Sequence, residues 1–331
     1  MSILGFIIIS LVFLIILYLA IFFKFGYVDC ESSVCLVGKT ALVTGGSSGI
    51  GYQIVLSLAS RGCKVIIADR IVDATIKEAI IGETDNSNIV LEYVDFASFK
   101  SIRNFVQKLK TYEEKLDILV NNVGIGKGPE TPSGDGLNQT LQINYYGPFL
   151  LTHLLIDLLK NSNGGRIIFT ASVASFFHNM TRDFVTSDTI QLPLFRMRDY
   201  ANAKLMTVVT SDMFAEKLKR FNITCNCYHP GIVQSTFFKN TQVHLNYYSF
   251  WDLSIYFSLF LVSILFGVSP KKAAQAGINL ATSKKFKNTT GIFFGKYFPN
   301  LKPLHSSDKV FCNKIWAASE QIVKLKPEEL L

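Results

Sequence analysis

The chain has 331 residues, of which 49% are hydrophobic and 18% are charged. This composition excludes a disordered chain, a collagen-like chain and a small disulfide-rich scaffold, because so long and apolar a chain can bury a sizeable core. The formal net charge is +8, and the segment from Ser269 to the end contributes +7 of it, from eleven lysines and four acids. So basic a segment favours an anionic partner.

Two uncharged apolar stretches, residues 3–23 and 253–270, indicate which anionic partner to expect. Because the lysines accompany these apolar stretches, we expect them to bind acidic membrane lipid rather than nucleic acid. The sequence also has no zinc finger, basic zipper or RNA-binding aromatic signature. A solvated lysine face is the alternative. The six cysteines form no CxxC pair and the five histidines no HExxH spacing, so we expect free thiols and no metal site.

Residues 3–23 predict a membrane anchor. At 1.5 Å per residue they span about 30 Å, the thickness of a hydrocarbon core. Ala20 is followed by bulky apolar residues and Lys24 rather than by a cleavage site. We expect residues 1–24 to form one uncleaved transmembrane helix, with a buried core helix as the alternative, and residues 25–38 to form a linker. The positive-inside rule places the remainder in the cytosol, as in a single-pass protein of the endoplasmic reticulum.

From Lys39 onward, short β-branched apolar runs alternate with helical stretches. We predict strands at residues 40–43, 64–68, 89–94, 116–120, 166–170 and 222–228. Strands that alternate with helices favour βαβ units and a parallel sheet covered on both faces. The expected fold is therefore α/β, a Rossmann-type doubly wound parallel sheet in one domain over residues 39–331, preceded by the transmembrane helix.

The first predicted strand runs into the glycine-rich turn TGGSSGIG at residues 44–51. Gly45 permits a tight turn, Gly49 lets the backbone approach a pyrophosphate, and Gly51 lets the next helix pack on the strand. A P-loop reading of Gly38-Lys39-Thr40 fails, because these residues precede a strand rather than follow one. The turn predicts a dinucleotide site, whose candidate residues are Thr44, Gly45, Ser47, Ser48, Gly49, Ile50 and Gly51.

The second predicted strand ends at Asp69 and Arg70. A carboxylate at this position binds the adenosine ribose hydroxyls of NAD(H) and repels the 2′-phosphate of NADP(H), whereas an arginine attracts that phosphate. Because both residues are present, we expect NAD(H) and NADP(H) both to be usable.

The order of the later motifs resembles that of the classical short-chain dehydrogenase/reductases, over about residues 39–323. The glycine turn matches the family's TGxxxGxG, and residues 121–124, NNVG, match its NNAG with valine in place of alanine. Further single-residue matches follow in the family's order. They are Asp95, Asn122, Asn144, Ser172, the Tyr200 and Lys204 of YxxxK, and the PG turn of Pro230 and Gly231.

The resemblance implies a role for each residue. Tyr200 would be the proton donor and acceptor, Lys204 would hold the nicotinamide ribose, Ser172 the substrate oxygen, and Asn144 a proton-relaying water. The cofactor would also contact Asp95, Asn122, Pro230, Gly231, Ile232 and Val233. From the residues alone, Tyr200 and Lys204 are four apart and share a helix face, where an ammonium lowers the pKa of a neighbouring phenol. A surface pair is the alternative for an isolated Tyr and Lys.

The spacing of Ser172 and Tyr200, 28 residues, is similar to that of the retinol dehydrogenase-like branch. So are residues 144–152, 227–233, 269–274 and 290–294. Where this branch has a threonine after the PG turn, the chain has Ser235 and Thr236. The branch mostly uses NADP(H), so the resemblance leans towards that cofactor.

The second apolar stretch lies within residues 243–270, which cover the substrate cleft in the resembling family. A second membrane span would separate residues 290–294 from their own sheet, so we reject it. We expect instead a lid that dips into the bilayer, edged by interfacial aromatics such as Trp251.

Together these features predict a membrane-anchored NAD(P)(H)-dependent oxidoreductase for a lipophilic alcohol or carbonyl, retinoid- or steroid-like. The expected partners are that substrate and membrane lipid. Both a monomer and a homodimer are compatible with the sequence. The alternative is a catalytically silent, cofactor-binding membrane scaffold.

Overall fold

The computed structural model describes residues 30, 32–126, 128–129, 131–182, 198–233, 267–295 and 300–331. The predicted anchor lies outside these residues, and so do Ser235, Thr236 and residues 243–266 of the predicted lid. Among the helices of the described ranges, none has both the length and the apolarity that a membrane span requires.

A seven-stranded sheet forms the centre of the domain, and all its strands are parallel. Their order is β3-β2-β1-β4-β5-β6-β7. The strands are β1 (Thr40–Thr44), β2 (Lys64–Asp69), β3 (Ile89–Tyr93), β4 (Ile118–Asn121), β5 (Arg166–Thr170), β6 (Thr224–Tyr228) and β7 (Phe293–Phe294). The six predicted strands are confirmed to within two residues at each end. β7 is not among the six predicted strands, because two residues are too few to produce a pattern, although residues 290–294 are expected to belong to the sheet.

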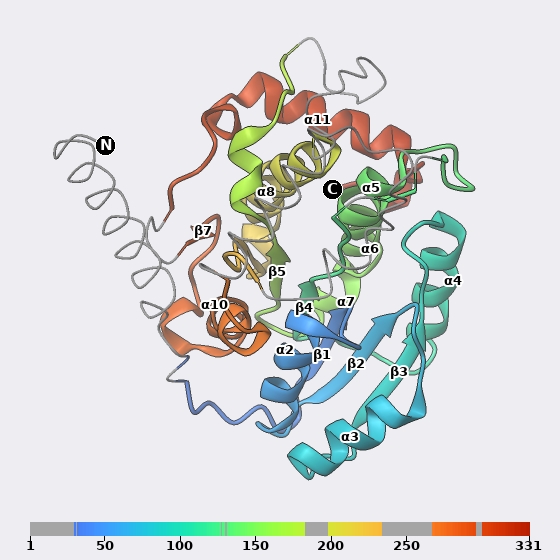
Figure 1. Cartoon of the computed structure of the whole chain (residues 1–331), viewed down its shortest axis with the longest axis vertical. Coiled ribbons are helices and arrows are strands. Elements are labelled where there is room, and N and C mark those ends of the chain that lie inside the picture. Colours follow the sequence, from blue (N-terminus) through green and yellow to red (C-terminus); the bar gives the residue numbers. More distant parts are fainter. Residues whose placement is uncertain are drawn as a thin grey trace, which may run out of the picture.

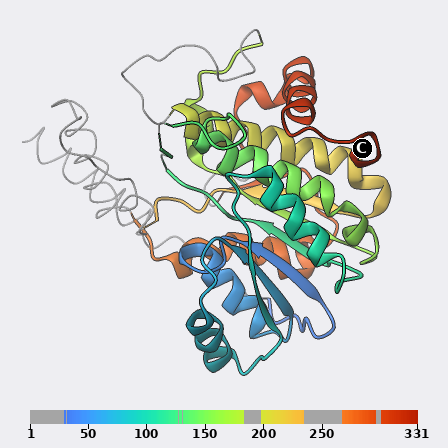
Figure 2. The ribbon, with the colours of Figure 1, turned by 90° about the vertical axis from the view of Figure 1, so that its right-hand side faces the viewer.

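Helices cover both faces of the sheet (Figures 1 and 2). On one face lie α2, α3 and α10, and on the other α4, α6 and α8. The helices are α2 (Gly49–Ala59), α3 (Ala74–Thr84), α4 (Phe99–Leu109), α5 (Gln139–Leu141), α6 (Gly147–Leu154), α7 (Ile156–Lys160), α8 (Arg198–Leu218), α10 (Pro270–Thr282) and α11 (Lys309–Ile322). Short turns of helix complete the described elements: η1 (Gln142–Tyr146), η2 (Val173–Phe177), η3 (Lys219–Phe221), η5 (Lys284–Phe286), η6 (Leu304–Ser307) and η7 (Pro327–Glu329).

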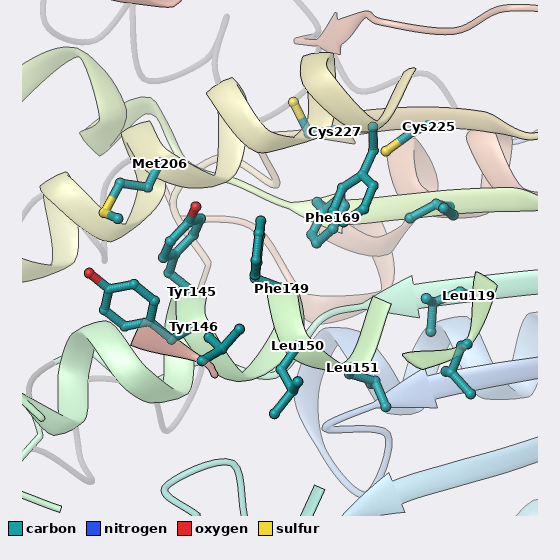
Figure 3. Packing of buried hydrophobic residues seen from close by; sticks show 14 of the residues in the cluster. Leu119, Tyr145, Tyr146, Phe149, Leu150, Leu151, Phe169, Met206, Cys225 and Cys227 are labelled. Atoms are coloured by element: carbon teal, nitrogen blue, oxygen red, sulfur yellow. The ribbon is translucent and has the colours of Figure 1, made fainter. Parts of the chain in front are cut away.

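The larger of the two cores lies between the sheet, α6, α8 and α11 (Figure 3). The ring of Phe149 from α6 lies 5.9 Å from that of Phe214 in α8 and 5.2 Å from that of Trp316 in α11, measured between centroids. A buried aromatic side chain of this kind stabilises the fold by about 2 kcal/mol. The C-terminal helix α11 is therefore part of the domain and packs against the same core as α8.

Cys225 and Cys227 of β6 also belong to this larger core, because their side chains lie on the face of the sheet that α8 covers. Both are fully buried, and because they are two apart on a strand their side chains point to the same face of the sheet. Burial raises the pKa of both thiols well above the ordinary value, so neither is a reactive thiolate.

Candidate active site

The carboxyl ends of the parallel strands meet at one edge of the sheet, and the predicted site residues follow these ends. In open α/β sheets this edge, at the point where the strand order reverses, is where ligands bind. Here the order reverses between β1 and β4. At or just after a strand end lie Thr44 (β1), Asp69 (β2), Asp95 (β3), Asn122 (β4), Ser172 (β5) and Pro230 (β6).

Hydrogen bonds join the turns after β1 and β4. The Thr44 hydroxyl oxygen accepts from the backbone N–H groups of Asn122 and Val123, both at 2.9 Å. The side-chain Nδ2 of Asn122 donates to the carbonyls of Thr44 (3.2 Å) and Gly45 (3.3 Å). The valine that replaces the family's alanine therefore still takes part, through its backbone, in fixing the glycine turn.

The shape of the glycine turn fits a dinucleotide diphosphate. Gly45 and Gly49 have φ of +65° and +57°, which disfavour other residues. A Cβ on Gly51 would lie 2.1 Å from the Gly45 carbonyl oxygen, whereas one on Gly49 would meet nothing within 4 Å. The Ser48 side chain makes no capping hydrogen bond and the first turn of α2 carries no acid. Open space thus adjoins Gly49 at the positive end of a helix, which is suited to an anion.

Asp69 is tied to the glycine turn. Its Oδ2 accepts from the Ser47 backbone N–H (3.1 Å) and its Oδ1 from that of Ile71 (3.2 Å). The Arg70 side chain beside it is exposed. Asp95 is half-buried and its Oδ1 accepts from the Ala97 backbone N–H at 2.9 Å.

The segment that follows β6 and contains the PG turn contacts the glycine turn. Gly231 has φ +79°, and the following Val233 pairs in parallel with Val268. The Ile232 carbonyl accepts from the Val268 backbone N–H at 2.9 Å. Val233 and Ile50, both predicted cofactor contacts, belong to one small apolar cluster. The structure therefore brings these two residues together, although they are far apart in the sequence.

Tyr200 and Lys204 lie on the first turns of α8. Lys204 is 4% exposed, and its Nζ donates to the Thr170 carbonyl at 2.8 Å and lies 5.5 Å from the centroid of the Tyr200 ring. Ser172 follows β5, caps η2 through the Ala174 backbone N–H (3.2 Å), and makes a side-chain hydrogen bond with Tyr200. Three of the four predicted catalytic side chains, those of Ser172, Tyr200 and Lys204, are therefore neighbours.

The expected lowering of the Tyr200 pKa is wrong. Burial, which disfavours the phenolate, raises the pKa of Tyr200 to about 12, and the hydrogen bond with Ser172 only partly opposes this. Burial also lowers the pKa of Lys204 to about 8. The physical reason is that Lys204 directs its N–H to a carbonyl rather than to the phenol, so desolvation outweighs the attraction of the ammonium.

Asn144 lies in the π-helix η1, a geometry that often marks functional sites. Its Oδ1 accepts from the Ile125 backbone N–H (3.1 Å), and its Nδ2 donates to the carbonyls of Ile125 (2.9 Å) and Thr140 (2.8 Å). A Cβ on Gly124 would lie 2.7 Å from Asn144 Oδ1 and 3.7 Å from Lys204 Nζ. Gly124 thus lies between Asn144 and Lys204, and a Cβ there would displace Asn144 Oδ1 while it would only contact Lys204 Nζ.

Sequence reasoning missed Thr170 as a site residue. Its carbonyl accepts from Lys204, and its hydroxyl lies 3.3 Å from Asn122 Oδ1 and 3.1 Å from the buried hydroxyl of Tyr228. Thr170 therefore links the Lys204 ammonium to the residues that hold the glycine turn. Thr170 is the last residue of the strand predicted at 166–170, and this position at the carboxyl end of a strand could have marked it as a site residue.

Comparisons with known proteins agree with this geometry. The family model described as short chain dehydrogenase matches residues 39–182. Retinol dehydrogenase 13 of Mus musculus is 33% identical over 298 residues, which cover 89% of this chain and 87% of that protein. Dehydrogenase/reductase SDR family member 13 of Bos taurus is 31% identical over 304 residues, covering 91% and 77%.

Two solved structures show how far the likeness in fold extends. The active-site complex of Pseudomonas aeruginosa RhlG with NADP is 26% identical, with a TM-score of 0.59 and coverage of 78% of this chain and 95% of that one. L-sorbose reductase from Gluconobacter frateurii, solved with NADPH and L-sorbose, is 21% identical, with a TM-score of 0.63 and coverage of 80% and 96%. The second likeness concerns the fold alone.

Proposed function

Because this chain belongs to the short-chain dehydrogenase/reductase family, within its retinol dehydrogenase-like branch, we propose that it is an oxidoreductase of lipophilic alcohols or carbonyls, retinoid- or steroid-like. One observation carries the proposal: Ser172, Tyr200 and Lys204 lie together beside an open glycine turn. A catalytically silent scaffold is the rival, but such a protein would be free to lose these three side chains.

The chain's own residues divide the chemistry between them. A bound nicotinamide cofactor supplies or accepts the hydride. The glycine turn would hold its diphosphate, Asp69 and Arg70 its adenosine ribose, and Lys204 its nicotinamide ribose. Tyr200 gives a proton to the substrate oxygen in reduction and takes one in oxidation, while the Ser172 hydroxyl orients that oxygen. Removal of Ser172, Tyr200 or Lys204 should thus affect turnover more than fold.

The direction of proton transfer gives a pH prediction. Since the pKa of Tyr200 is about 12, the phenol is protonated near neutrality and is ready to donate in carbonyl reduction. Oxidation needs the phenolate, whose fraction rises about tenfold per pH unit below the pKa. We therefore expect initial rates of alcohol oxidation to climb about tenfold per unit from roughly pH 6 to 8, and carbonyl reduction to stay nearly constant there. Steady-state rates at saturating cofactor measure this, and a flat oxidation profile would contradict it.

The cofactor preference depends on Asp69 and Arg70. We propose that NAD(H) and NADP(H) are both usable, with a lean towards NADP(H), because an exposed arginine adjoins a carboxylate that would repel a 2′-phosphate. Asp69→Ala should tighten NADP(H) binding and weaken NAD(H) binding, each by about fivefold. The two Kd values, measured by fluorescence titration, should thus change in opposite directions. An unchanged Kd ratio would show that Asp69 acts only on the glycine turn.

Membrane attachment is the second part of the proposal. It rests on residues 3–23, an uncharged apolar stretch long enough to cross a hydrocarbon core. We propose an endoplasmic reticulum membrane, a cytosolic domain and a lid at 243–270 that contacts lipid. The full chain should then resist carbonate extraction, and a chain lacking residues 1–24 should float only in part with liposomes. A truncated chain that stays wholly in the aqueous fraction would contradict the lipid-contacting lid.

The activity itself is tested with purified full-length protein in detergent. The panel contains retinals, steroid ketones and aliphatic aldehydes, each with NADH and with NADPH, and the cofactor's absorbance reports turnover. We expect turnover of at least one apolar class. Cofactor binding without turnover across the panel would favour the scaffold.

A further inference from the structure

Ser172 caps η2 and Tyr200 lies in α8, and a pair of asparagines, one just after η2 and one in α8, joins these segments close by. The Asn179 backbone N–H donates to Asn202 Oδ1 at 3.1 Å, and Asn202 Nδ2 donates back to Asn179 Oδ1 at 2.8 Å. Asn202 is only 6% exposed, so both bonds at this end are shielded from water. Reciprocal bonds of this kind fix the distance and the orientation between the two segments.

Asn202 lies on the side of α8 opposite to Tyr200 and Lys204. It lies two residues after Tyr200 and two before Lys204, and residues two apart project from opposite sides of a helix, whereas residues four apart share a side. The segment from Ser172 to Asn179 therefore touches both sides of the first turns of α8. Ser172 meets Tyr200 on one side, and Asn179 meets Asn202 on the other.

η2 packs directly against α8, and Ser175 is fully buried, but the hydrogen bonds described within η2 stay inside the turn. Ser172 is held inside its own turn, since its Oγ accepts from the Ala174 N–H (3.2 Å) and its carbonyl from the Ser175 N–H (3.0 Å). Ser172 thus lies between η2 and the sheet, to which the neighbouring Ala171 N–H is bonded through the Tyr228 carbonyl at 2.7 Å. Further on, the ring of His178 meets that of His305 at 4.8 Å, a contact with η6 rather than with α8.

We propose that Asn202, paired with Asn179, is a positioning residue that holds the Ser172 hydroxyl at the Tyr200 phenol. Asn202 touches no reacting atom; it sets where η2 lies against α8. The inference rests on the proposed function, because its consequence for turnover presupposes that Ser172 and Tyr200 act on a substrate. An error in placement of this kind lowers kcat while substrate and cofactor binding persist.

Three substitutions separate the two bonds. Asn202→Ala removes both bonds, whereas Asn179→Ala keeps the bond from the backbone N–H of residue 179 to Asn202 Oδ1. Asn179→Asp keeps both bonds, because a carboxylate oxygen still accepts from Asn202 Nδ2, and the exposed position tolerates a charge. We expect kcat to fall about tenfold, about threefold and less than about twofold, in that order. The KM for substrate and the cofactor Kd should stay within about twofold of the wild-type values.

Asn86→Ala is the matched control. Asn86 is also a buried asparagine whose Nδ2 donates twice, to the carbonyls of Ala59 and Cys63, both at 2.9 Å, at the other end of the sheet. It should lower Tm as Asn202→Ala does, without changing kcat per folded molecule. If Asn86→Ala lowers kcat equally, Asn202 has only a general structural role and the proposal is wrong.

A second readout needs no turnover. A fluorinated tyrosine incorporated at position 200 allows its phenol to be titrated by ¹⁹F NMR. Asn202→Ala should raise the pKa of that phenol, because the hydrogen bond from Ser172 that favours the phenolate is lost. Asn179→Asp should leave it unchanged. If the wild type turns over no substrate, the proposed function fails while this titration still tests the positioning. An unchanged titration in Asn202→Ala would overturn the proposal.

Discussion

Tyr200→Phe should lower kcat at least about a hundredfold, with the cofactor Kd within about twofold of wild type. The substitution removes the phenolic hydroxyl, the group that exchanges a proton with the substrate oxygen, and it keeps the ring that packs beside Lys204. Pre-steady-state kinetics with cofactor and the best substrate of the panel measure the loss. Near-wild-type turnover would remove Tyr200 from the mechanism.

The matched control is Tyr145→Phe. The Tyr145 hydroxyl is fully buried in the larger core and bonds to Thr210 and Ser319, both at 2.8 Å. Loss of these bonds should cost about 1–2 kcal/mol of stability, seen as a lower Tm, and leave kcat unchanged. If the two variants lose activity equally, the effect of Tyr200→Phe reflects stability rather than proton transfer.

Lys204→Met should lower kcat at least about a hundredfold and also weaken cofactor binding about tenfold or more. Methionine fills the volume of the buried stem but cannot donate to Thr170 or to a ribose hydroxyl. Isothermal titration with each cofactor and steady-state kinetics separate the two losses. Unchanged cofactor affinity would show that Lys204 does not contact the ribose.

Lys302→Met gives the corresponding control. Lys302 Nζ bonds to both carboxylate oxygens of Asp212 and to the Gly291 carbonyl, each at 2.8 Å. Its loss leaves the Asp212 carboxylate without this cation and should lower Tm, while the cofactor Kd and kcat stay as in wild type. A loss of cofactor affinity here would point to a general effect of removing a half-buried lysine.

Most of the fold could be predicted from the sequence, because its signals are local. The β-branched run of β2 is buried along its middle residues, as expected for a strand covered on both faces, and the glycine turn runs from β1 into the first residues of α2. Tyr200 and Lys204 could be placed for the same reason, since their spacing puts them on one side of α8. The two-residue β7 could not, because it owes its place to pairing with β6.

The contacts that adjust the site could not be predicted, because they depend on packing between distant segments. The Lys204 ammonium bonds to a backbone carbonyl, which has no side-chain signature. The Asn179–Asn202 pair joins residues 23 apart. The error over the Tyr200 pKa has the same origin: the spacing indicates a neighbouring ammonium but not how deeply the phenol is buried.

The central claim, that the chain catalyses hydride transfer, is tested most directly by isotope transfer. Purified protein is incubated with reduced cofactor deuterated at the transferable position and with the best carbonyl of the panel, and the product alcohol is analysed by mass spectrometry. We predict one deuterium per product molecule at the former carbonyl carbon, with formation at least about a hundredfold slower in Tyr200→Phe. Tight cofactor binding with no deuterium in any product would contradict the account and identify the chain as a silent scaffold.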